Sequence, residues 1–157
     1  MINFYEDDEL RIRSDLMPAI TVRAFVPQDT KGVRQDKRRR PYMLRNDVHF
    51  QIKHKKNFYI IPFKEDYTWD GASIPFMFRP LIGKKGSLEF LLPSMVHDKM
   101  CEEPRHIRNN RNLASKVFRA LLLSNGVGKI RANVMYHAVD NYQKLKSWDW
   151  DYYFSLV

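Results

Sequence analysis

The chain has 157 residues, of which 44% are hydrophobic and 13% aromatic, and its formal net charge is +9. A chain of this length can bury a core without disulfides or metals, and the composition excludes an intrinsically disordered protein. The single cysteine excludes an internal disulfide and favours a reducing compartment. No apolar run is long enough for a membrane helix, and the acidic start argues against a secretory signal.

The first half of the chain is expected to form strands. Residues 20–26 are rich in β-branched side chains, residues 48–52 alternate between apolar and polar, and residues 58–61 form an apolar run that ends at Pro62. The polar residues 53–57 join the last two segments, which predicts a β-hairpin without the Asn-Gly pair of the tightest turns.

Positive charge is concentrated between residues 31 and 56, which include ten Lys or Arg residues and only two acidic residues, both Asp. Such a segment favours a polyanionic partner: nucleic acid, acidic lipid headgroups or an acidic protein surface. The alternative is a solvated loop, and the segment lacks the interleaved aromatics of a base-stacking surface. The candidate polyanion-binding residues are Arg38, Arg39, Arg40, Lys55 and Lys56.

The second half has helical periodicity. One helix is expected near Ser87 to Met100, with Pro93 kinking or restarting it, and a second from a cap at Asn109 or Asn110 to a stop at Asn125-Gly126. A third begins near Lys129 and is expected to bury one stripe of side chains: Ile130, Val134, Met135, Ala138, Val139 and Tyr142.

Together these elements predict a single α+β domain over residues 1–157, with a small antiparallel sheet in the N-terminal half and three helices in the C-terminal half. Residues 1–57 would hold strands and the basic loop, and residues 58–148 the rest of the core. The aromatic-rich tail, residues 149–157, is expected to pack on the core or on a partner.

A polar turn between the two halves is the first candidate for chemistry. Gly71 supplies backbone freedom to the sequence Asp70-Gly71-Ala72-Ser73-Ile74-Pro75, and Asp70 and Ser73 are short polar side chains suited to a turn. Either residue could simply cap a short helix begun by Ile74-Pro75. The functional interpretation makes Asp70 a carboxylate presented to a site.

The second candidate is His97-Asp98, which follows the apolar sequence Leu91–Val96. A charged pair among apolar residues needs partners, so we expect His97 to act as a base or metal ligand and Asp98 as a ligand or orienting group. A buried histidine satisfied by a backbone carbonyl is the alternative. Cys101 lies one helical turn after His97, as either a candidate nucleophile or a core thiol.

The sequences Trp69–Pro75 and Val96–Asp98 resemble the family called domain of unknown function 1353, found largely in bacteriophages and prophages. The resemblance covers about residues 58–148, with a weaker match at residues 133–139, and implies that the turn and the His-Asp pair form one site. Two positions depart from the family pattern. Cys101 stands where a tyrosine is common, and Ala114-Ser115 replaces an Ala-Asp pair, which removes a carboxylate that could orient the histidine.

Three functions follow as hypotheses. The first is a phage-encoded hydrolase of envelope lipid or cell-wall material, with His97 as base and Ser73 as a hydrogen-bonding group. Asp70 and Asp98 would orient the histidine, or all three would hold a divalent metal: calcium or magnesium if carboxylates dominate, zinc if His97 ligates. The second is a non-enzymatic virion or accessory component that binds other phage proteins. The third is a nucleic-acid-binding protein. The resemblance places the chain in the host cytoplasm or the phage particle.

Overall fold

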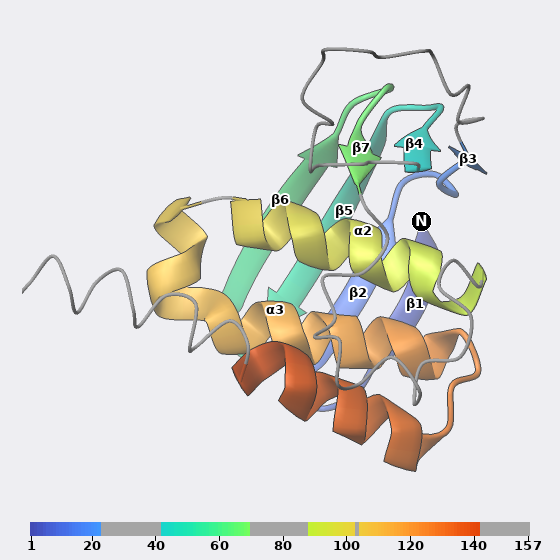
Figure 1. Cartoon of the computed structure of the whole chain (residues 1–157). Coiled ribbons are helices and arrows are strands. Elements are labelled where there is room, and N and C mark those ends of the chain that lie inside the picture. The colour runs from blue at the N-terminus through green and yellow to red at the C-terminus, as the bar shows by residue number, and fades with distance from the viewer. Residues whose placement is uncertain (23–41, 70–87, 103, 142–157) are drawn as a thin grey trace, which may run out of the picture. The chain divides into compact units, whose positions relative to one another are not determined.

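A computed structural model describes residues 1–22, 42–69, 88–102 and 104–141 (Figure 1). Antiparallel sheets form the N-terminal half and three helices the C-terminal half, which confirms the α+β class. The chain divides into two compact units, Met1–Gly71 and Ala72–Val157. Folding of both units as one domain stays a prediction.

The first unit is built on a four-stranded antiparallel sheet. Its strands are β1 (Ile2–Glu6), β2 (Leu10–Ser14), β5 (Val48–His54) and β6 (Asn57–Phe63), in the order β1-β2-β5-β6. Successive side chains of a strand point to opposite faces, and burial in β2 and β5 alternates accordingly. One face carries the buried side chains Leu10, Ile12, Val48, Phe50 and Ile52.

The predicted hairpin is confirmed as β5 and β6, but its connection is shorter than the sequence indicates. His54 pairs with Asn57, so only Lys55 and Lys56 form the turn. Lys55 has a φ of 56°, a left-handed conformation that Asn and Gly adopt more readily than Lys does. Pro62 is tolerated in β6 because β6 is the last strand in the order of this sheet. On the outer side of such a strand, a missing N–H costs no hydrogen bond to a neighbouring strand.

No strand is predicted from the sequence at the positions of β1 and β2, because the acidic residues between them do not indicate a hairpin turn. The side chain of Asp7 organises this turn: its Oδ1 accepts hydrogen bonds from the backbone N–H groups of Glu9 (2.8 Å) and Leu10 (2.7 Å). Its Oδ2 accepts a third from the hydroxyl of Tyr5 (2.8 Å). The acidic run is therefore a side-chain-stabilised turn between two strands.

A second, three-stranded sheet consists of β3 (Ile20–Val22), β4 (Tyr42–Leu44) and β7 (Thr68–Trp69), in the order β3-β4-β7. The predicted strand at residues 20–26 is confirmed for residues 20–22, and residues 23–26 lie outside the described residues.

A series of aromatic contacts ends at Trp69. Neighbouring ring centroids are 5.6 Å apart from Phe4 to Phe50 and from Phe50 to Phe63, 5.3 Å from Phe63 to Tyr67 and 6.0 Å from Tyr67 to Trp69. These spacings fall in the range of favourable aromatic pairs. Trp69, the last described residue of the first unit, is therefore anchored to the first sheet.

The second unit contains α2 (Leu88–Glu102), α3 (Pro104–Ser124) and a helix over residues 129–141. Pro93 lies inside α2 without ending it. The prediction of a cap at Asn109 or Asn110 is wrong: α3 begins at Pro104, because proline fits the first helical position, where its missing N–H would have no partner.

The predicted stop of α3 is confirmed. Gly126 has a φ of 91° and donates its N–H to the carbonyl of Leu123 (3.1 Å), and Val127 donates to the carbonyl of Leu122 (3.0 Å). This pair of hydrogen bonds is the Schellman motif, which requires a left-handed residue at the Gly126 position.

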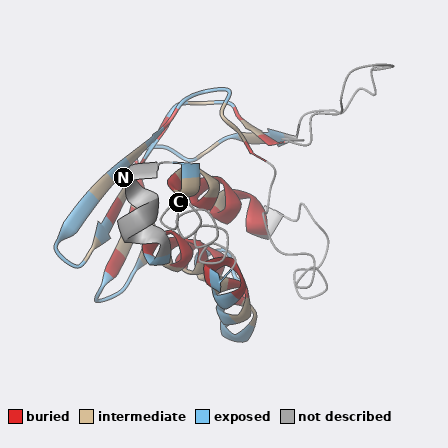
Figure 2. Ribbon diagram, turned by 60° about the vertical axis from the view of Figure 1, so that its left-hand side comes forward, coloured by how far each residue is buried: buried red, intermediate tan, exposed pale blue. Residues whose placement is uncertain are grey.

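The helix over residues 129–141 packs on α3 through a buried stripe (Figure 2). The prediction that Ile130 belongs to this stripe is wrong, since Ile130 is 84% exposed. At about 100° per residue, Ile130 lies roughly 140° around the helix from Met135. Tyr142 and the aromatic tail lie outside the described residues. The core of this unit contains Phe90, Phe118, Leu122, Val127, Ala132, Met135 and Val139.

Candidate functional site

His97 lies in the second half of α2 and is buried, with 4% of its surface exposed. Its imidazole packs against the ring of Phe118 on α3, at 5.3 Å between centroids and an interplanar angle of 57°. The neighbouring residues Met95 and Val96 are fully buried. An ionisable ring in such surroundings is costly unless other polar groups compensate for the lost water.

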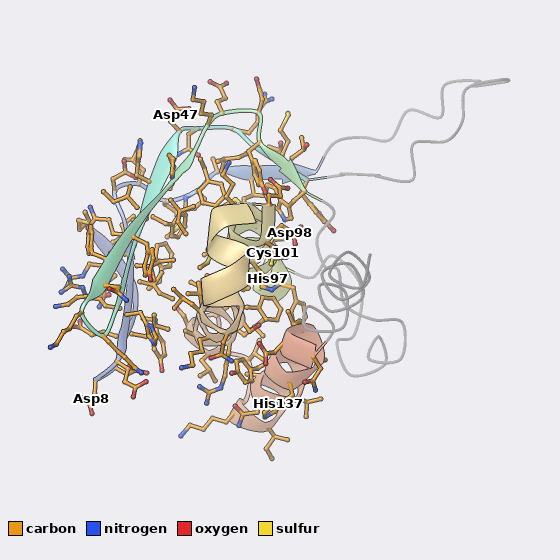
Figure 3. All side chains as sticks on the ribbon, turned by 90° about the vertical axis from the view of Figure 1, so that its left-hand side faces the viewer. Asp8, Asp47, His97, Asp98, Cys101 and His137 are labelled. Carbon is orange, nitrogen blue, oxygen red and sulfur yellow. The ribbon has the colours of Figure 1, made fainter. Side chains whose placement is uncertain are left out.

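Among the described residues, the side chains of Asp98 and Cys101, both on α2, approach the imidazole (Figure 3). Oδ1 of Asp98 is 3.9 Å from Nδ1, an ion-pair distance rather than that of a short hydrogen bond. Sγ of Cys101 is 3.6 Å from Nε2 and 3.9 Å from Nδ1. The four-residue spacing of His97 and Cys101 places them on one face of the helix.

Burial and the neighbouring side chains have opposite effects on the charge of the imidazole. Burial alone would lower the pKa of His97, because it disfavours the charged ring. The contacts with Asp98 and Cys101 outweigh burial and raise the pKa of His97 to about 9. The ring is therefore protonated at neutral pH, where it can donate a proton or stabilise a neighbouring anion.

A second buried polar pair joins α3 to the helix over residues 129–141. The hydroxyl of Ser115 donates a hydrogen bond of 3.1 Å to Oδ1 of Asp140, and both residues are buried. Ser115 precedes Phe118 by three residues and so shares its face of α3, one turn from the ring that contacts His97.

Asp140 is a buried polar residue that the sequence analysis missed. The resemblance implies an aspartate at the position of Ser115, and in the structure Ser115 instead contacts a carboxylate, that of Asp140, from the next helix. The sequence signal for this residue is its position: Asp140 is an acidic residue that directly follows Ala138 and Val139, which are buried.

The structure places only some of the sequence-predicted site residues. It brings His97 into contact with Asp98 and Cys101. Asp70 and Ser73 lie outside the described residues, so their meeting with His97 stays a prediction. Among the predicted polyanion-binding residues, Lys55 and Lys56 are exposed at the β5–β6 turn, and Arg38, Arg39 and Arg40 lie outside the described residues.

Within residues 1–22, 42–69, 88–102 and 104–141, no group of three or more His, Cys, Asp or Glu residues could hold a metal ion. The proposed ligand set includes Asp70, which is not among these residues, so a calcium, magnesium or zinc site stays a prediction. The same part of the chain contains no helix of the length and apolarity that a bilayer crossing requires.

A family model described as "Protein of unknown function (DUF1353)" matches residues 43–139, and the chain belongs to this family. The match begins at β4, earlier than the resemblance in the sequence indicates, and so includes the β5–β6 hairpin. Uncharacterized protein y4iH of Sinorhizobium fredii (strain NBRC 101917 / NGR234) is 33% identical over 76 residues, which are 48% of this chain and 30% of that protein. No solved structure matches the chain.

Proposed function

We propose that this chain is a hydrolase of envelope lipid or cell-wall material in which His97 transfers protons. The observation that carries the proposal is the buried imidazole of His97 between a carboxylate and a thiol. Ionisable groups with pKa values shifted by burial and by specific partners are concentrated at functional sites. A purely structural position in this apolar helix would be filled at lower cost by an apolar side chain.

The proposed roles of His97 and Asp98 rest on their contacts, and those of Asp70 and Ser73 rest on the family resemblance. His97 is protonated at neutral pH, so it first acts as an acid toward a leaving group and becomes a base once that proton has left. Asp98 orients the ring and stabilises its charge. Asp70 and Ser73 are proposed as further members of the site, on the family resemblance. The same resemblance supports a phage-encoded protein of the host cytoplasm or the phage particle.

The test is hydrolysis by the purified chain of phospholipid vesicles and of peptidoglycan fragments, with release of fatty acid and of soluble fragments as the readouts. We expect His97→Gln to lower the rate about 10²- to 10⁴-fold, as removal of an acid–base group does. His137→Gln is the matched control, because His137 is exposed on the helix over residues 129–141 (Figure 3).

Thermal unfolding of each variant separates loss of the fold from loss of the acid–base group. Asp98→Asn is the second variant, because it keeps the size of the side chain and removes its charge; we expect a smaller loss of rate. Hydrolysis of neither substrate, or full activity in a folded His97→Gln variant, would overturn the proposal.

A second function, binding of a polyanion, is supported by the β5–β6 hairpin. Lys53, Lys55 and Lys56 are exposed, and Lys53 pairs with Arg11 of β2 in the register of the sheet. Affinity for anionic vesicles or for duplex DNA should fall with salt, and more weakly in a Lys55→Gln/Lys56→Gln variant. Lys129→Gln is the control, because Lys129 is exposed in the other unit. Equal salt dependence in all three chains would contradict polyanion binding by this hairpin.

A further inference from the structure

The outer face of the first sheet, opposite the buried side chains of β2 and β5, carries a row of exposed apolar residues. Alternate residues of β6 point to this face, and Phe58, Ile60 and Pro62 are all exposed there. Phe58 is 51% and Ile60 60% exposed. No strand of the described residues lies beyond β6 in this sheet. Neighbouring apolar side chains held in water on a rigid strand mark a contact surface.

Lysine side chains lie beside this apolar row. In the register of β5 and β6, Lys53 is directly opposite Phe58, and such cross-strand neighbours are about 5 Å apart. Lys53 is exposed, and so are Lys55 and Lys56 in the turn. The hairpin, residues 48–63, contains no Asp or Glu. It therefore combines exposed apolar side chains with a net positive charge.

The acidic residues of this sheet belong to β1 and its turn. Glu6 of β1 is opposite Arg11 of β2 in the register, and its Oε2 is 3.8 Å from Nη2 of Arg13. The β1–β2 turn adjoins the hairpin, since the carbonyl of Glu9 accepts a hydrogen bond from the N–H of Lys55 (2.9 Å). An anionic surface therefore fits against the β6 side of the outer face and is repelled on the β1 side.

We propose that the outer face of the β5–β6 hairpin binds the surface of an anionic lipid bilayer, with Phe58 and Ile60 inserted among the headgroups and the lysines at the level of the phosphates. This inference rests on the polyanion binding proposed for the hairpin and names the polyanion. Apolar side chains gain free energy at the boundary of headgroups and acyl chains. Duplex DNA binds lysines through its phosphates and gives an exposed aliphatic row no such environment.

The lysines suit this position because their hydrocarbon stems can lie along the apolar row while their ammonium groups reach the lipid phosphates. Each lysine near an anionic bilayer adds to the binding free energy, and the effect falls off within a Debye length. The same positive charge disfavours a second copy of the hairpin as the occupant, because it would bring like charges together.

The first experiment measures co-sedimentation of the chain with vesicles of ether-linked phosphatidylglycerol and of ether-linked phosphatidylcholine. Ether-linked lipids have no acyl ester, so binding is measured apart from the proposed hydrolysis. We expect the wild type to bind phosphatidylglycerol at least about tenfold more tightly than phosphatidylcholine. His97→Gln should bind as the wild type does, so the hydrolase and the binding face are tested separately. Equal affinity of the wild type for the two lipids would overturn the inference.

The second experiment changes the apolar row and leaves the charge as it is. Phe58→Thr/Ile60→Thr should lower the affinity for phosphatidylglycerol about tenfold or more, because it removes the inserted apolar surface. Ile130→Thr is the matched control, because Ile130 is 84% exposed and lies in the other unit. Thermal unfolding confirms that each variant is folded. Wild-type affinity in a folded Phe58→Thr/Ile60→Thr variant would overturn the inference.

The third experiment tests the orientation of the sheet. Asp8 and Glu9 are exposed in the β1–β2 turn, and Asp8→Asn/Glu9→Gln should raise the affinity for phosphatidylglycerol, because it removes repulsion beside the lysines. Lys55→Gln/Lys56→Gln should lower it on the order of tenfold at low salt. A lower affinity in Asp8→Asn/Glu9→Gln would contradict binding by the positive side of the face.

The outcomes also separate this inference from polyanion binding as such. Binding of duplex DNA that is weaker in Lys55→Gln/Lys56→Gln and unchanged in Phe58→Thr/Ile60→Thr, without binding of phosphatidylglycerol vesicles, keeps the polyanion site and rejects the bilayer. Self-association that is lost in Phe58→Thr/Ile60→Thr, again without vesicle binding, assigns the apolar row to a second copy of the chain and also rejects the bilayer.

Discussion

The two units differ in what they bury. Among the described residues of the first unit, the buried polar residue is Ser14, whose hydroxyl donates a hydrogen bond of 2.6 Å to the carbonyl of Leu16. The described part of the second unit buries the ionisable residues His97 and Asp140, together with Ser94 and Ser115. The described part of the first unit therefore buries no His, Asp, Glu, Lys or Arg residue, whereas the second unit holds His97 charged through its contacts with Asp98 and Cys101.

The largest effect should come from the core of the first unit. Phe50 is fully buried and contacts the rings of Phe4 and Phe63. Phe50→Ala should lower the free energy of unfolding by about 3–5 kcal/mol through lost burial and the cavity left behind. Phe58→Ala, at a position that is 51% exposed on the same hairpin, should cost less than about 1 kcal/mol. Urea denaturation measures both, and equal losses would show that the sheet does not have one buried face.

The pH dependence of stability tests the buried charge of the second unit. The pKa of His97 is raised from 6.5 to about 9, so the stability that its protonation contributes is complete below about pH 6.5 and lost as the pH rises through about 9. The loss over this interval is on the order of 3 kcal/mol. Urea denaturation across this range should show it in wild type and His137→Gln and not in His97→Gln. A wild-type stability that rises over the interval would contradict a protonated, buried imidazole.

The smallest effect is expected from replacing two buried serines with alanine, one serine in each unit. Ser115→Ala removes a hydrogen bond to a buried carboxylate and should cost about 1.5–3 kcal/mol, because the oxygen of Asp140 loses a donor. Ser14→Ala removes a bond to a neutral carbonyl and should cost about 1 kcal/mol. The difference in unfolding free energy between these variants is the measurement. A Ser115→Ala variant no less stable than Ser14→Ala would show that Asp140 does not depend on this serine.

The fold class and the elements with strong periodicity could be predicted from the sequence. Apolar and polar residues alternate along β5 of the β5–β6 hairpin. The end of α3 has a glycine at the position that requires a left-handed backbone. Strands β1 and β2 were not predicted, because the turn between them depends on hydrogen bonds that the Asp7 side chain accepts from backbone N–H groups, and an acidic run alone does not indicate such a turn. The start of α3 differs from the prediction because the helix begins at Pro104, a residue that also commonly ends helices, and not at Asn109 or Asn110.

The candidate site was predictable only where its residues lie on one helix. The spacing of His97 and Cys101 fixes their common face, and the contact between them agrees with it. The partners from other elements, Phe118 and Asp140, depend on how α3 packs against its neighbours, which no local pattern encodes. Their identification therefore required the tertiary structure.

The aromatic series that ends at Trp69 has a consequence for the chain that follows it. Trp69 is 1% exposed and its ring stacks on that of Tyr67, and the Cα atom of the next residue in the chain is about 3.8 Å from that of Trp69. A substitution as far back as Phe63 therefore acts, through Tyr67, on the position of Trp69, where the described part of the first unit ends.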